Sequence, residues 1–251
     1  MPTPSQLGAK LKDELGLKYH PVGFYYVDQK PSEAVGFKKD GGCIMGMIFA
    51  AAKGKMVAFD KDSAGWSCAA FYLGFRDWIR EGIEYFLAHG NAEFEECEKI
   101  VAAPEKAKEY LESLRFPELA TGAAVFKPLE KFSADETPEL VLLFANPDQL
   151  GALSYLAQYR DPVADDLVVS RFASGCGAVV SVPMDYKRRG LKRAVWGGHD
   201  MTARRKLPAD LMTFTVPYDF AVEFYEDLDS SFVNEPEWVK IRERCLSKPS
   251  Q

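Results

Sequence analysis

Apolar positions along the first half of the chain follow two distinct patterns that predict alternating helices and strands. Leu7, Leu11 and Leu15 lie about one helical turn apart, between Ser5, a typical N-cap residue, and Gly16, a typical helix stop. Aromatic and β-branched residues fill the next apolar run, which is typical of a strand. The predicted elements are a helix at 5–15, a strand at 22–27, a helix at 43–52, a strand at 56–59, helices within 69–87 broken near Gly74 or Gly82, and a helix at 104–114.

The second half shows a similar alternation. Residues 140–144 form a continuous apolar run, typical of a buried strand, and Asn146 with Pro147 is typical of a helix start. The run 179–182 is apolar and mostly β-branched, so it too is predicted as a strand. The other expected elements are a strand around Val125, a helix to about Tyr159 and a short strand at 167–170.

The two halves agree in the order strand, helix, short strand, small residues and cysteine. Asp77 and Asp185 follow Cys68 and Cys176, respectively, at the same spacing. We therefore predict an α/β or α+β fold made of two fused repeats, 1–118 and 119–251, packed as one compact domain with a ligand site between them. Coincidence among common α/β patterns is the alternative.

Composition narrows the class of protein. The chain has 251 residues and a net charge of −6, so nucleic acid is not an expected partner. The first residues lack the features of a secretory signal, and no apolar stretch has the length of a membrane span, so we expect a cytoplasmic protein without a membrane partner. Five cysteines spread through the sequence argue against a disulfide framework. A homo-oligomer stays an alternative to a monomer.

Three cysteines carry the candidate chemistry. Cys43, Cys68 and Cys176 all lie among small residues near predicted element starts, where a helix N-terminus favours a thiolate. Three thiolates can hold a transition metal or an iron–sulfur cluster with one coordination position open. Because no C-x-x-C pair is present, small buried core residues are the alternative interpretation.

A second candidate site combines glycine and charge. In the segment Gly197 to Arg204, two glycines free the backbone and Asp200 can cap a short helix. We predict that Gly198, His199, Asp200 and Arg204 bind a small anionic molecule or the anionic group of a cofactor. The segment lies in a basic run, 187–206, which is otherwise typical of a solvated face. A capped helix with a surface ion pair is the alternative here.

A cysteine-dependent enzyme acting on a small acidic substrate is the alternative from another class. Cys176 would then be the nucleophile and His199 the base, with Asp200 as a poorly placed orienting group. A partner-binding protein in which every cysteine belongs to the core is a third interpretation. No common nucleotide, zinc-protease or serine-hydrolase motif is present.

Several short segments also resemble a known family. They are 21–27, the helix at Cys43, Gly-Trp-Ser-Cys68, Ser-Gly-Cys176-Gly-Ala and Asp200-x-x-x-Arg204. Together they resemble domain of unknown function 169, a group of prokaryotic proteins without an established activity. This resemblance spans nearly the whole chain and implies no reaction, substrate, cofactor or catalytic residue.

Overall fold

The computed structural model describes residues 1–37, 42–64, 67–89, 98–114 and 118–247. Among them, seven strands form one mixed sheet in the order β2-β3-β1-β4-β7-β6-β5. Neighbouring strands are antiparallel except β5 and β6. The strands are β1 (Val22–Val27), β2 (Val57–Asp60), β3 (Ala123–Pro128), β4 (Leu140–Ala145), β5 (Val168–Val169), β6 (Ala194–Gly197) and β7 (Met212–Pro217). The predicted α/β or α+β class is confirmed.

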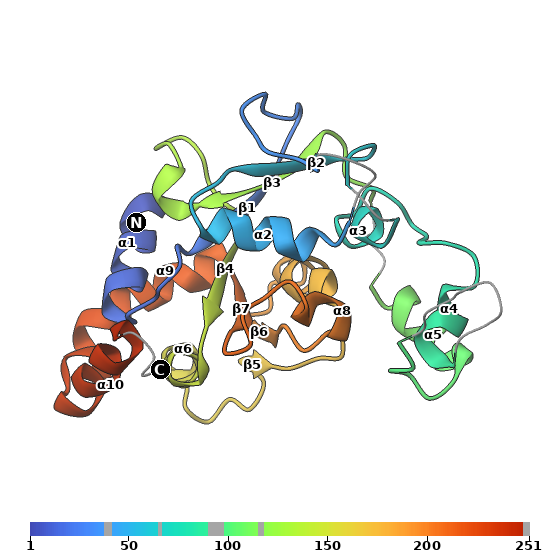
Figure 1. Cartoon of the computed structure of the whole chain (residues 1–251). Helices are drawn as coiled ribbons and strands as arrows, with labels where there is room; N and C mark the ends of the chain where they lie inside the picture. The colour runs from blue at the N-terminus through green and yellow to red at the C-terminus, as the bar shows by residue number, and fades with distance from the viewer. Residues whose placement is uncertain (38–41, 65–66, 90–97, 115–117, 248–251) are drawn as a thin grey trace.

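Helices cover both faces of the sheet (Figure 1). One face packs against α2 (Ile44–Ala52), α3 (Ser67–Tyr72), the π-helical segment η2 (Gly177–Ser181), α7 (Val182–Arg188) and α8 (Met201–Arg204). The other packs against α1 (Pro4–Glu14), α6 (Pro147–Gln158), α9 (Tyr218–Asp227) and α10 (Pro236–Leu246). Each face has its own hydrophobic core, with the sheet between them.

Strand β4 is apolar at every position because it is buried on both faces. Leu140, Leu142 and Phe144 point into the core on the α2 face, while Val141 and Leu143 point into the core on the α6 face. A strand buried on both faces needs apolar residues at successive positions. β4 therefore separates the two cores at the centre of the sheet.

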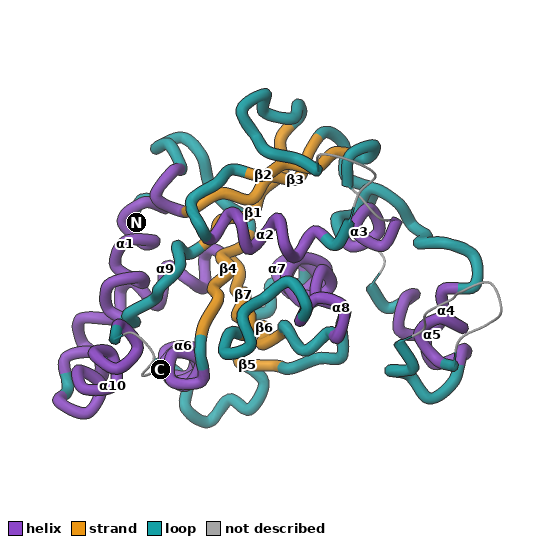
Figure 2. Tube along the Cα trace, viewed as in Figure 1, coloured by secondary structure: helices purple, strands orange, loops and turns teal. Residues whose placement is uncertain are grey.

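Two further helices lie apart from the sheet. Figure 2 shows α4 (Ile83–Ala88) and α5 (Pro104–Glu112) projecting beyond α3. The predicted helical region at 69–87 is thus two helices, with Gly74 and Gly82 both in positive-φ conformations between them. No helix in the described part of the chain is long and apolar enough to cross a membrane.

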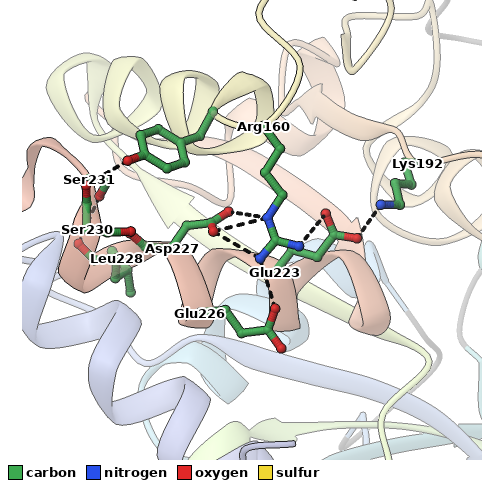
Figure 3. Close-up of polar contacts among 9 residues, drawn as sticks. Arg160, Lys192, Glu223, Glu226, Asp227, Leu228, Ser230 and Ser231 are labelled. Atoms are coloured by element: carbon green, nitrogen blue, oxygen red, sulfur yellow. Dashed lines mark hydrogen bonds and ion pairs between the residues drawn. The ribbon is translucent and has the colours of Figure 1, made fainter.

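On the α6 face, an arginine ties the end of α6 to α9 (Figure 3). The Arg160 guanidinium donates hydrogen bonds to Asp227 at 2.8–3.0 Å and to Glu226 at 2.8 Å, and it lies 3.6 Å from Glu223. Lys192, from the basic run, pairs with the same Glu223. Arg160 and Lys192 therefore offset two of the three negative charges of Glu223, Glu226 and Asp227 at this surface.

Two local predictions are wrong. The N-cap of α1 is Thr3, whose hydroxyl accepts from the Gln6 amide at 3.2 Å, because Pro4 begins the helix earlier than Ser5. The predicted strand at 179–182 is instead the end of η2 and the start of α7. Those residues are almost fully buried, so their apolar character reflects burial and not strand periodicity.

The two halves of the sheet show a limited correspondence. From the β1–β4 boundary outward, one half reads β1, β3, β2 and the other β4, β7, β6, β5. However, the helices that follow β1 and β4 lie on opposite faces, since α2 belongs to one core and α6 to the other. The structure does not show an internal repeat, and the duplication stays a prediction.

Candidate functional site

Three cysteines from separate segments of the chain gather on the α2 face of the sheet. Cys43 is the N-cap residue of α2, Cys68 lies in α3, and Cys176 directly precedes η2. Hydrogen bonding between the Cys43 and Cys176 thiols is the largest influence on the pKa of each, and Cys68 interacts electrostatically with both. Cys43 and Cys68 are partly exposed, whereas Cys176 is buried. All three belong to or pack against the core on this face, and their sharing of one ligand stays a prediction.

The three thiols differ in acidity. The hydrogen bond from Cys176 lowers the pKa of Cys43, assisted by the Met45 backbone amide at the start of α2, and together they outweigh burial. The same hydrogen bond, together with burial, raises the pKa of Cys176 well above its ordinary value. Burial raises the pKa of Cys68 to about 11. Cys43 is therefore the most readily ionised of the three thiols.

Asp200 holds the loop before Cys176 against α8. Its carboxylate accepts hydrogen bonds from the Thr202 amide at 2.8 Å, from the Ala203 amide at 3.2 Å and from the Gly175 amide at 2.6 Å. The first two cap the helix, as predicted, and the third crosses to the cysteine loop. Asp200 thus fills the helix N-terminus with its own negative charge.

Gly175 allows this close packing. A Cβ atom at this position would lie 2.6 Å from the Ala203 Cβ and 3.0 Å from Met45 in α2. Any larger residue would push the Cys176 loop away from both helices. The absence of a side chain at Gly175 therefore allows the loop before η2 to pack closely against both α2 and α8.

Two tyrosines that the sequence analysis did not nominate extend the site. The Tyr110 hydroxyl accepts a hydrogen bond from the Ser174 amide at 2.9 Å and lies 3.5 Å from the Tyr72 hydroxyl. Burial raises the pKa of both phenols, so both stay neutral. Tyr110 comes from α5, so it joins the projecting helices to the cysteine loop. Both tyrosines lie in helices among apolar residues, so the sequence does not distinguish them from ordinary core residues.

Charged groups lie at the edge of the thiol cluster. Glu98 accepts a hydrogen bond from the Thr202 hydroxyl, and burial with the nearby Asp200 charge raises its pKa despite that bond. The Lys206 side chain packs near Gly46 on α2, and its positive charge acts on Cys43. Lys206 and Asp200 therefore act on Cys43 with opposite charges, while Glu98 lies beside Asp200 at the start of α8.

The backbone at Cys176 has an uncommon form. Residues Gly177–Ser181 are π-helical, and the segment continues directly into α7. π-Helical turns are rare and frequently occur at functional sites, because the wider turn displaces side chains from ordinary helical positions. Here the segment is tied at its start by the Ser174 hydroxyl, which accepts from the Gly177 amide at 3.0 Å.

The residues predicted to bind an anion, Gly198, His199, Asp200 and Arg204, do not converge on a common point. The Arg204 guanidinium donates to the backbone carbonyl oxygens of Pro208 at 3.1 Å and Ala209 at 2.8 Å, and also to that of Leu211. His199 is exposed, and no hydrogen bond or ion pair joins it to another described residue. Gly198 adopts a φ of +88° beside the Thr213 backbone. The Arg204 guanidinium is thus bound to loop carbonyl oxygens. The amides at the start of α8, which were predicted to bind an anion, donate instead to the Asp200 carboxylate.

The basic run is largely neutralised. Lys187 pairs with Glu139, Arg189 with Asp185 at 3.2 Å, and Arg193 with Asp166. These partners lie on other elements or on the preceding helical turn, so the interpretation as a solvated, paired face fits better than an anion site.

The alternative catalytic arrangement does not form. Cys176 is buried in the core, and Asp200 accepts hydrogen bonds from backbone amides and does not orient His199. Of the other cysteines, Cys245 lies on α10, against Asn146 at 3.6 Å on the opposite face, and Cys97 lies outside the described residues.

A ready-made metal site is not seen. Within the described ranges, no group of three or more histidine, cysteine, aspartate or glutamate side chains has the arrangement needed to hold a metal ion.

Comparison with known proteins gives the family. Neither a curated protein nor a solved structure matches the chain. The model of a family described as uncharacterised ArCR, domain of unknown function 169, matches residues 10–227, which include the three converging cysteines, Tyr72, Tyr110 and Asp200. The chain belongs to the domain of unknown function 169 family.

Proposed function

We propose that the protein binds a thiophilic transition metal ion, or an iron–sulfur cluster, through Cys43, Cys68 and Cys176. The observation that supports this proposal is the convergence of the three thiols from α2, α3 and the start of η2. Sulfur ligands select soft and borderline metals, and three protein ligands leave a fourth position for water or substrate. The partly exposed Cys43 and Cys68 give such an ion a route to the buried Cys176.

The surroundings fit a bound cation in two further respects. Asp200 places negative charge near the sulfurs, which favours a positive ion. The hydrogen bond from the Gly175 amide to Asp200 ties the Cys176 loop to the start of α8. Binding requires the thiol side chains to move closer together, because no group of three in the described residues is arranged to hold a metal ion.

The test is a titration of the reduced, metal-free protein with Co²⁺ under anaerobic conditions, followed by sulfur-to-cobalt charge-transfer absorption. We expect one Co²⁺ per chain, displaced by Zn²⁺, and at least a tenfold loss of affinity in each of C43S, C68S and C176S. C245S is the matched control, since Cys245 lies on the opposite face, and it should bind as the wild type does. The proposal is contradicted if the wild-type protein does not take up Co²⁺, or if the three variants bind Co²⁺ as tightly as the wild type does.

A further inference from the structure

A groove lies between α6 and α10, on the opposite face of the sheet from the thiol cluster (Figure 1). Arg244, near the end of α10, pairs at 2.6 Å with Asp148 in the first turn of α6, so the end of one helix lies beside the start of the other. The groove has a volume of about 430 Å³, which is within the range of small-ligand sites. Its lining combines aromatic rings with carboxylates, and this combination indicates the class of ligand.

Three aromatic side chains line the groove: Tyr155 from α6, Phe232 from the short helix before α10, and Trp238 from α10. Phe232 contacts both of the others edge to face, with ring centroids 6.1 Å from Tyr155 and 5.6 Å from Trp238. Trp238 is buried, and its indole N–H donates to the Glu14 carbonyl oxygen at 2.9 Å, which fixes the ring. Tyr155 is 72 % exposed. The groove therefore has a fixed aromatic floor and one aromatic ring open to solvent.

Carboxylates give the groove a negative charge. Besides Asp148, which is paired with Arg244, Glu235 and Glu237 line the groove, and both are exposed. No ion pair joins Glu235 or Glu237 to another residue in the described part of the chain. The carboxylates are not arranged to hold a metal ion, since no such group occurs among the described residues. The groove thus has the charge to attract a cation and an apolar surface for one that carries alkyl groups.

We propose that this groove binds a small alkylated ammonium ion, with its alkyl groups against the aromatic rings and its charge facing Glu235 and Glu237. The face of an aromatic ring carries partial negative charge, so it attracts an organic cation while it covers the alkyl groups. A quaternary ammonium ion has no N–H group, so it needs no hydrogen-bond acceptor at the buried floor. The groove shares no residue with the thiol cluster, so this proposal and the metal site can each fail without the other.

The test is an NMR titration of the full-length protein with choline, which carries a trimethylammonium group, and with the neutral analogue in which a tert-butyl group replaces it. Binding is followed by the chemical shift of the Trp238 indole N–H, because this group is fixed beside the groove. We expect choline to bind saturably and the neutral analogue to bind about tenfold more weakly, because the two have the same shape and differ in charge. This comparison uses the wild-type protein, so it does not depend on the folding of a variant.

Variants at the groove separate the contributions of ring and charge. Y155L keeps an apolar side chain but removes the ring, so it should weaken choline binding about fivefold, whereas Y155F keeps the ring and should bind choline as the wild type does. The double variant E235Q/E237Q should weaken choline binding about threefold and leave the affinity for the neutral analogue unchanged. Y85A, at an exposed tyrosine on α4, is the matched control and should bind choline as the wild type does.

Equal affinity of the wild-type protein for choline and its neutral analogue overturns the proposal, because the groove would then be an apolar surface without selectivity for charge. The proposal is also wrong if choline gives no saturable shift, or if neither Y155L nor E235Q/E237Q weakens choline binding. Thermal unfolding followed by circular dichroism separates lost binding from lost folding. Because Tyr155, Glu235 and Glu237 are all exposed, we expect these variants to remain folded.

Discussion

Arg204 follows Asp200 by one helical turn, but its guanidinium faces a loop and not the thiols. It donates to three carbonyl oxygens, those of Pro208, Ala209 and Leu211. Hydrogen bonds from a charged donor to backbone carbonyls stabilise a folded loop by about 1.5–3 kcal/mol each at most, less where solvent competes. Arg204 therefore belongs to the architecture around α8.

This assignment predicts that R204A lowers the free energy of unfolding by about 2 kcal/mol and leaves Co²⁺ affinity within about twofold of the wild type. Urea denaturation and the Co²⁺ titration measure the two quantities. R205A is the matched control because the neighbouring Arg205 is exposed, and it should change stability by less than about 0.5 kcal/mol. A stable R204A protein with lost ligand affinity would restore Arg204 to the site.

Glu136 is the residue whose ionisation most clearly supports the fold. Burial opposes its charge, but hydrogen bonds from Lys127, Ser133 and Tyr25 outweigh burial and lower the pKa of Glu136 to about 2. Lys127 is buried and lies 2.7 Å from both carboxylate oxygens, so the pair is mostly shielded from solvent. Losing the charge on Glu136 leaves an unpaired buried ammonium.

Because the folded pKa of Glu136 lies below the unfolded value, its contribution is complete above about pH 4.5 and is lost as the pH falls toward 2. We expect stability to decrease by up to about 3 kcal/mol over that interval from this group. E136Q should be less stable at neutral pH and should show a flatter dependence in acid, measured by urea denaturation at several pH values. E109Q, at the exposed Lys106–Glu109 pair, is the control and should leave the slope unchanged. Equal slopes for the wild type and E136Q would refute this assignment.

At the scale of elements, Gly175 determines how closely the Cys176 loop approaches α2 and α8. G175A should lower stability by about 1–3 kcal/mol through overpacking and should weaken Co²⁺ binding, because the loop carries Cys176. Denaturation and Co²⁺ titration measure the two effects. G151A is the control, since the Cβ would meet no atom within 4 Å on α6, and it should raise stability by up to about 1 kcal/mol. Unchanged stability and Co²⁺ binding in G175A would show that the loop does not need this approach.

The elements also show which parts of the fold can be predicted from sequence. Helix α6 has strong local signals in Asn146, Pro147 and Gln149, and both the helix and its capping box are present. The run at 179–182 has no such signals, because a short β-branched run is equally compatible with a buried helix. Its helical form depends on packing against β6 and β7, which the local sequence does not encode.

Some parts of the candidate site could likewise be predicted from the sequence, and others could not. The cysteines could be nominated because reactive or ligating side chains are recognisable by type. The bond from the Gly175 amide to Asp200 and the contact of Tyr110 with Ser174 join residues far apart in the sequence, so no spacing rule reveals them. The carbonyl partners of Arg204 could not be predicted either, because they lie in a loop whose conformation the sequence does not specify.

At the scale of the whole molecule, the sheet brings α2, α3 and the start of η2 to one face while α1, α6, α9 and α10 cover the other. Cys43, Cys68 and Cys176 thereby gather on the same side, although they are separated in the chain, and Tyr110 connects them to the projecting helices α4 and α5. We propose that the three residues form one thiol centre.

X-ray absorption at the zinc edge tests that claim most directly. The reduced full-length protein, loaded with one Zn²⁺ per chain and freed of excess metal, should show three sulfur neighbours at about 2.3 Å with one lighter ligand, and C68S should show two sulfurs. A zinc ion bound only by nitrogen and oxygen, or a sulfur count unchanged by C68S, would contradict the account.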